Sequence, residues 1–91
     1  MSGPHYPFPP ARAYRLNRCL YAIKSDPEFC TRFLADPHAA AAEMELSETE
    51  RAALAPLDRD TLVGLGGHPY LVFMAELRLR MARDASGLEY F

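Results

Sequence analysis

Several features that mark particular classes of protein are missing from this sequence. It has only two cysteines, Cys19 and Cys30, which form no C-x-x-C pair and are too few for a disulfide framework. Its formal net charge is −2, whereas nucleic-acid-binding proteins usually carry a strong basic surplus. No apolar run approaches the roughly 18 residues that a membrane-spanning helix needs. We therefore expect neither a nucleic acid nor a membrane as partner, and we expect a reduced, cytoplasmic location.

Sequence patterns of β structure and of secretion are missing too. No run of β-branched residues alternates with polar ones, so no strand is expected. The first ten residues, MSGPHYPFPP, lack the basic and apolar regions of a secretory signal. The four prolines among them oppose a helix. We expect residues 1–10 to form a proline-rich arm that drapes over the domain, docks onto a partner through Tyr6 and Phe8, or simply frays.

What the sequence does contain is helical periodicity. With 91 residues, of which 49% are hydrophobic, the chain has room for one domain. Ala13, Leu16, Leu20 and Ile23 recur at spacings of three and four, which predicts one apolar face on a helix over residues 11–24. Tyr14 and Tyr21 are expected to widen that face.

Start and stop signals divide the next forty residues into four short helices. Asp26-Pro27 and Asp36-Pro37 each combine a capping residue with a proline at the first helical position. Ser47 and Glu50 match a capping box, and Asp58 is a further cap. Gly66-Gly67 is a typical helix end, because glycine readily adopts the left-handed conformation. The predicted helices cover residues 27–35, 37–45, 48–55 and 59–65.

The last helix is the most hydrophobic and begins at His68-Pro69. Residues 70–75 are apolar on all sides, which predicts burial on all sides. The helix then becomes amphipathic and is expected to end at Ser86-Gly87. The sequence thus predicts an all-α fold, a single small domain over residues 11–85 with five or six short helices packed around this C-terminal helix, and a tail over residues 86–91.

Charge is distributed unevenly along the chain. Residues 1–35 are mainly basic, and residues 36–60 are mainly acidic. This asymmetry fits internal ion pairing or docking between copies in an oligomer, although solvated helix faces would give the same pattern.

Candidate chemistry is sparse. The three histidines, His5, His38 and His68, are not linked by any H-x-H, H-x-x-x-H or E-x-x-H spacing, so no metal site is predicted in this chain. No nucleophile has a histidine at a suggestive spacing. His68 stands between the glycine pair and the N-terminus of the last helix. It is expected either to help hold an anion or polar ligand there or to cap the helix and pack on Tyr70.

A series of short motifs resembles the alpha subunits of protocatechuate 4,5-dioxygenase. The motifs span residues 14–77, almost without gaps, and their order and spacing carry the resemblance. They are Tyr14-Arg15-Leu16-Asn17, Arg32-Phe33-Leu34-Ala35-Asp36-Pro37, Leu46-Ser47, Leu57-Asp58-Arg59-Asp60 and Gly66-Gly67-His68-Pro69-Tyr70. The family has asparagine where this chain has His68, and its members continue after the last helix with segments that reach the active site.

The resemblance implies a small, non-catalytic subunit of an extradiol aromatic-ring-opening dioxygenase, active in aromatic compound catabolism. Its larger beta subunit would carry Fe(II), and this chain would pack on it and help shape its substrate pocket. Gly67, His68 and Tyr70 are the residues expected near that pocket or partner. The alternative is a free-standing helical binding or interaction module of the same fold, possible as a homo-oligomer, with no role in ring cleavage.

Overall fold

The computed structural model describes the backbone of residues 13–88 and the side chains of residues 13–84. Within these residues there are six helices and no strand. The helices are α1 (Tyr14–Ser25), α2 (Pro27–Ala35), α3 (Pro37–Glu43), α4 (Glu48–Leu54), α5 (Arg59–Gly64) and α6 (Pro69–Leu88). The all-α prediction is therefore confirmed. The expected arm over residues 1–10, including His5, lies outside the described residues.

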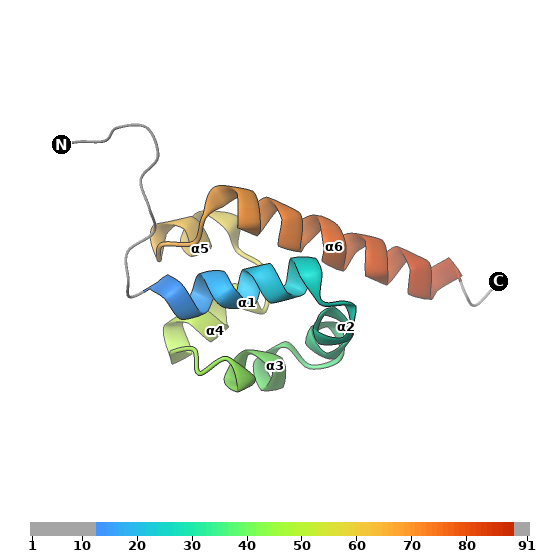
Figure 1. Cartoon of the computed structure of the whole chain (residues 1–91), viewed down its shortest axis with the longest axis horizontal. Coiled ribbons are helices and arrows are strands. Elements are labelled where there is room, and N and C mark those ends of the chain that lie inside the picture. The colour runs from blue at the N-terminus through green and yellow to red at the C-terminus, as the bar shows by residue number, and fades with distance from the viewer. Residues whose placement is uncertain (1–12, 89–91) are drawn as a thin grey trace.

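Helices α1 and α6 form the centre of the domain. They lie side by side and run in the same direction, and α3 and α4 lie on the other side of α1 from α6 in the view of Figure 1. Helix α6 also packs against α2 and α5. The expectation of short helices gathered around a C-terminal helix is thus confirmed, with α1 as its main partner.

The core comes from one side of each helix. In α1 the predicted face is fully buried, since Leu16, Leu20 and Ile23 are at most 1% exposed. In α2, Phe29 and Phe33 pack with ring centroids 6.5 Å apart. Helix α6 contributes Val72, Ala75 and Leu79, at spacings of three and four. Burying side chains of this size removes about 1.5–3 kcal/mol of unfavourable hydration for each large one.

The helix starts follow the local sequence signals. Asp26 accepts hydrogen bonds from the backbone N–H groups of Glu28 and Phe29 at 3.0 and 3.2 Å. Asp36 accepts one from Ala39, and Asp58 accepts one from Thr61. The capping box is complete. Each predicted cap is therefore confirmed.

Two helix ends differ from the expectation by more than one residue. Helix α3 ends at Glu43 rather than at Glu45, because Glu45 adopts a left-handed backbone with φ of 59° and turns the chain towards Leu46. Helix α6 continues through Ser86-Gly87 to Leu88. A glycine permits a left-handed end without requiring one, so the predicted stop at this pair and the start of the tail at residue 86 are wrong for the backbone.

Part of the charge asymmetry is resolved by internal ion pairs. Arg15 pairs with Glu45 at 3.6 Å, and Arg32 pairs with Glu43 at 3.1 Å. Both pairs join the basic first part of the chain to its acidic middle, as the sequence suggested. All four side chains are about half exposed or more, so each pair contributes little, typically under about 1 kcal/mol.

Candidate functional site

The side chain of Asn17 connects α1 to the turn between α5 and α6. Its Nδ2 group donates to the carbonyl oxygens of Ala13 and Gly66, each at 3.0 Å. Its Oδ1 accepts a hydrogen bond from the backbone N–H of His68 at 2.7 Å. One amide thus satisfies the backbone groups on both sides of Gly67, and it fixes where α6 begins relative to α1.

The turn itself depends on the two glycines. Gly66 has φ of 106°, a backbone conformation that residues other than glycine rarely adopt. The N–H of Gly67 donates to the carbonyl of Leu62 at 2.8 Å, and that of Gly66 donates to Val63 at 3.0 Å, which is the Schellman pattern of a helix end. A Cβ on Gly67 would lie 2.8 Å from the Leu62 carbonyl oxygen. The predicted role of this pair in ending the fifth helix is confirmed.

His68 is the N-terminal cap of α6. Its carbonyl accepts the first helical hydrogen bond, from Val72 at 3.0 Å, and its ring Nδ1 accepts from the N–H of Tyr70 at 3.1 Å. The capping expectation is therefore confirmed. Because Nδ1 is engaged as an acceptor, a neutral ring in this position carries its proton on Nε2, which stays available as a donor.

An apolar stripe runs along the side of α6 that faces away from the core. Tyr70, Phe73 and Met81 are 54%, 53% and 51% exposed. Met74 and Leu77 are half-buried and complete the spacings of three and four that place residues on one side of a helix. We call these five residues the outer stripe of α6. The expectation that residues 70–75 are buried on every side is wrong for the chain alone, because only the side bearing Val72 and Ala75 meets other helices.

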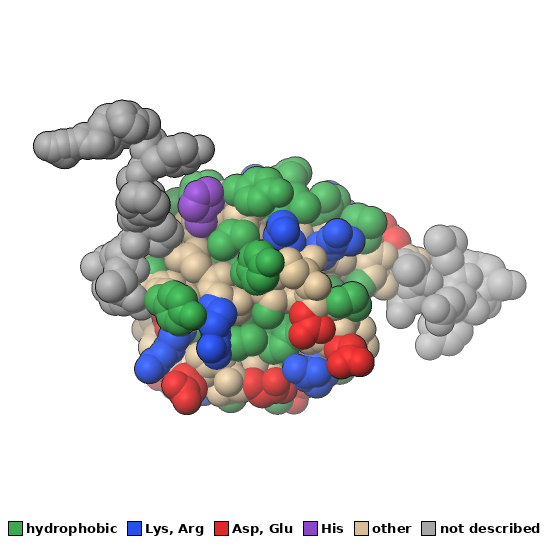
Figure 2. Space-filling view, in the orientation of Figure 1, with side chains coloured by type: hydrophobic (Ala, Val, Ile, Leu, Met, Phe, Trp, Pro, Cys, Tyr) green, Lys and Arg blue, Asp and Glu red, His purple; other side chains and the backbone are tan. Residues whose placement is uncertain are grey.

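The tyrosines of α1 also point outward. Tyr14 and Tyr21, which were expected to widen the buried face, are 65% and 56% exposed. They are seven residues apart and so lie on one side of the helix, roughly opposite Leu16 and Leu20. Figure 2 shows hydrophobic side chains over both α1 and α6 on the visible face, with Lys and Arg side chains among them. This chain thus presents an apolar, partly basic surface built by its two longest helices.

The three site residues predicted from the sequence gather at the junction of α5 and α6 but differ in accessibility. Gly67 is buried, His68 is half-buried and Tyr70 is exposed. Asn17, which organises the junction, was not among the predicted site residues. Asn17 belongs to the first motif of the family resemblance, and the glycine turn belongs to the last one. The spacing of the motifs did not indicate that these two motifs are in contact.

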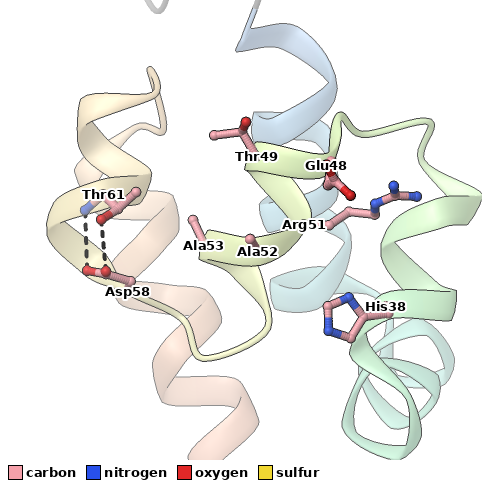
Figure 3. Close-up of a pocket in the computed structure, with 8 residues that line it drawn as sticks. All are labelled: His38, Glu48, Thr49, Arg51, Ala52, Ala53, Asp58 and Thr61. Carbon is pink, nitrogen blue, oxygen red and sulfur yellow. Dashed lines mark hydrogen bonds between the residues drawn. The ribbon is translucent and has the colours of Figure 1, made fainter.

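A separate hollow, lined by both polar and apolar groups, lies over α4, between α3 and α5. Figure 3 shows His38 and Arg51 on one side of α4 and Asp58 and Thr61 on the other. The Asp58 carboxylate is occupied by two hydrogen bonds from Thr61, one from its backbone and one from its hydroxyl. The polar groups therefore do not converge on one point, and this hollow offers no arrangement of acid, base and nucleophile.

The cysteines are held as hydrophobic residues. Both are buried and unpaired. Burial raises the pKa of the Cys19 thiol to about 12 and raises that of Cys30 as well, so neither is a thiolate at neutral pH. Within the described part of the chain, no three His, Cys, Asp or Glu side chains lie close enough together to hold a metal ion. His38 and His68 start different helices, and the His68 Nδ1 is already engaged.

Among the residues described, no helix is both long and apolar enough to cross a membrane. No curated protein and no solved structure matches the chain. A family model does match: the LigA subunit of the aromatic-ring-opening dioxygenase LigAB, over residues 16–84. The match includes Asn17, the glycine turn, His68 and the outer stripe of α6, and it agrees with the family that the motifs of residues 14–77 indicated. Because it covers well over half of the 91 residues, the chain belongs to the family of LigA subunits of aromatic-ring-opening dioxygenases.

Proposed function

We propose that this chain is a non-catalytic small subunit that packs on a larger, Fe(II)-bearing subunit of an aromatic-ring-opening dioxygenase and helps shape its substrate pocket. The family match over residues 16–84 carries the proposal. The iron would be held by the partner and would supply the oxygen chemistry. This chain would supply a surface, and we place its work in the cytoplasm, where its two unpaired cysteines stay reduced.

The outer stripe of α6 supports a role in association. Three large apolar side chains on one helix, each more than half exposed, form the kind of continuous patch that marks a protein interface. Aromatic residues and methionine are enriched at the centres of such interfaces. A small domain also gains stability when a partner covers such a patch, because its own core is limited.

The junction of α5 and α6 would approach the partner's pocket through His68 and Tyr70. Tyr70 continues the outer stripe, so a partner that covers the stripe also comes close to His68. The His68 Nε2 can donate a hydrogen bond to a phenol or carboxylate oxygen while Nδ1 keeps the cap on α6. Gly67 would contribute indirectly, by letting the turn approach Leu62 closely.

The test separates the two roles of His68. In the reconstituted complex, His68→Ser keeps a side chain that caps helices well but is too short to place a donor where Nε2 lies, whereas His68→Ala loses both the cap and the donor. We expect both variants to lower turnover of a catechol-type substrate, with only His68→Ala lowering the melting temperature of this chain. Equal turnover in wild type and His68→Ser would remove His68 from the pocket and leave it as a cap.

The free-standing module is the competing function, and the purified chain distinguishes it. A chain that self-associates, and whose addition leaves the ring-opening rate of the iron-bearing subunit unchanged, would favour the module. A rate or substrate affinity that depends on this chain favours the subunit.

A further inference from the structure

A groove opens where the end of α1, the start of α2 and the second half of α6 meet. It encloses about 280 Å³. Its buried lining is apolar, from Ile23 and Cys30, and Lys24 and Ala82 are half-buried. The exposed side chains of its lining are Pro27, Thr31, Arg78 and Met81. The groove therefore combines an apolar floor with two positive charges at its edge.

These two cations have no acidic partner among residues 13–84. The ion pairs within that part of the chain use Arg15, Arg32, Arg59 and Arg80. Lys24 instead lies over the Tyr21 ring, with Nζ 5.2 Å from its centroid. Arg78 is exposed, while its neighbour on the helix, Arg80, pairs with Glu76. Among residues 13–84, the two positive charges at the groove therefore have no paired carboxylate, unlike those of Arg15, Arg32, Arg59 and Arg80.

The groove is continuous with the outer stripe of α6. Met81 belongs to both. In Figure 2, Lys and Arg side chains lie among the hydrophobic ones over α1 and α6, while most of the visible acidic side chains lie over α2 and α3. A partner that covers the stripe must therefore also meet the two cations, and it gains most if it brings negative charge to them.

The positive charge of the groove also favours a different protein over a second copy of this chain as its partner. In a two-fold dimer the same patch meets itself, so a dimer formed through this groove would bring Lys24 and Arg78 near their own equivalents. Like charges brought together at an interface are costly. An acidic partner segment has no such cost, because it neutralises both cations.

We infer that this groove receives a segment of the larger, iron-bearing subunit in which an apolar side chain enters the groove and a neighbouring Asp or Glu pairs with Lys24 and Arg78. The inference rests on the proposed function, since it presumes that partner. Beyond the proposed function, it specifies which face of this chain binds the larger subunit and which kinds of side chain the bound segment carries.

The experiment measures the affinity of this chain for the iron-bearing subunit, identified by its stoichiometric iron and its ring-opening activity. Lys24→Glu and Arg78→Glu reverse the groove charges, and Arg78→Gln removes one of them. Arg83→Glu is the matched control, because it makes the same change of charge on the same helix. Arg83 lines a different hollow, together with Phe33 and Leu79. The melting temperature of each variant verifies that it folds.

We expect each reversal to weaken binding about tenfold or more, Arg78→Gln to weaken it less, and Arg83→Glu to change it little. The affinity of the wild type should fall with added salt more steeply than that of Arg78→Glu. If all four variants bind as the wild type does, the groove is not the docking site, although the proposed function stands. If the wild type binds no iron-bearing subunit, both fail together. A homodimer that is broken by the same reversals would assign the groove to a second copy and overturn the inference.

Discussion

The Oδ1 of Asn17 accepts a hydrogen bond from the backbone N–H of His68, 51 residues further along the chain, at 2.7 Å. The same side chain donates to the carbonyl of Gly66. Asn17 thereby ties α1 to the first residue of α6 and holds the candidate site residues in place. The first and last motifs of the sequence resemblance are thus parts of one structural unit.

Replacing Asn17 should loosen this unit. Asn17→Ala leaves the N–H of His68 and the carbonyl of Gly66 without their partner, and because both groups are only partly buried we expect a loss of about 1 kcal/mol, the low end of the cost of an unpaired group. For a domain of this size that loss lowers the melting temperature by about 4–8 °C for each kcal/mol, which thermal unfolding measures. Asn17→Asp keeps the acceptor for His68 but loses the donor to Gly66, so it should also destabilise the chain. A melting temperature unchanged in both variants would show that water replaces the amide.

Replacing Gly67 or Gly64 by alanine should change the stability of the chain in opposite directions. In Gly67→Ala the new Cβ would lie 2.8 Å from the Leu62 carbonyl oxygen and 3.3 Å from Val72 Cγ2, so the turn must shift, at a cost of about 1–3 kcal/mol. In Gly64→Ala the Cβ meets nothing within 4 Å. That change lies in a helix and should stabilise the chain by up to about 1 kcal/mol. Denaturant unfolding of the pair measures both signs, and a loss of stability in Gly64→Ala would contradict the structure.

The buried thiols should resist alkylation. Because burial raises the pKa of Cys19 to about 12, about one Cys19 thiol in ten thousand would be ionised at pH 8, and the thiolate is the reactive form. In a Cys30→Ser variant, labelling of Cys19 by iodoacetamide should therefore follow the rate of unfolding and become fast only in denaturant. Rapid labelling under native conditions would mean that α1 opens far more often than its burial implies.

The ion pair between Arg59 and Glu76 predicts a dependence of stability on acid. The hydrogen bond from Arg59 lowers the pKa of Glu76 below its usual 4.5, so the pair stabilises the fold above that pH and is lost as the pH falls through the lowered value. The melting temperature of the wild type should exceed that of Glu76→Gln at neutral pH, and the difference should vanish in acid. A difference that persists at about pH 2 would assign it to another cause, such as packing of the side chain.

The sequence predicted best where the signal is local. Asp26, Asp36, Ser47 and Asp58 cap the helices that follow them because a cap bonds N–H groups two or three residues away. The buried face of α1 followed from its periodicity for the same reason. These features define most of the helices, and hence the all-α fold.

What could not be predicted depends on contacts between distant segments. Asn17 looked like an ordinary polar residue of a helix, since its partners Gly66 and His68 lie about fifty residues away. Tyr14 and Tyr21 were assigned to the core because they are apolar, yet their side of α1 meets no other helix. The apolar run over residues 70–75 predicts burial, but the sequence does not say whether a neighbouring helix or another protein covers it.

The most direct test of the subunit account is the rate of ring opening with and without this chain. The chain is tagged and purified from extracts of the cells that make it, with its stoichiometric iron-bearing partner. The partner is then assayed for oxygen uptake on a catechol-type substrate, alone and after this chain is added back. The account predicts a complex whose turnover or substrate affinity falls when this chain is removed and returns when it is restored. The account would be contradicted if this chain is metal-free and binds no such partner. It would also be contradicted if the turnover and substrate affinity of the partner are the same with and without this chain.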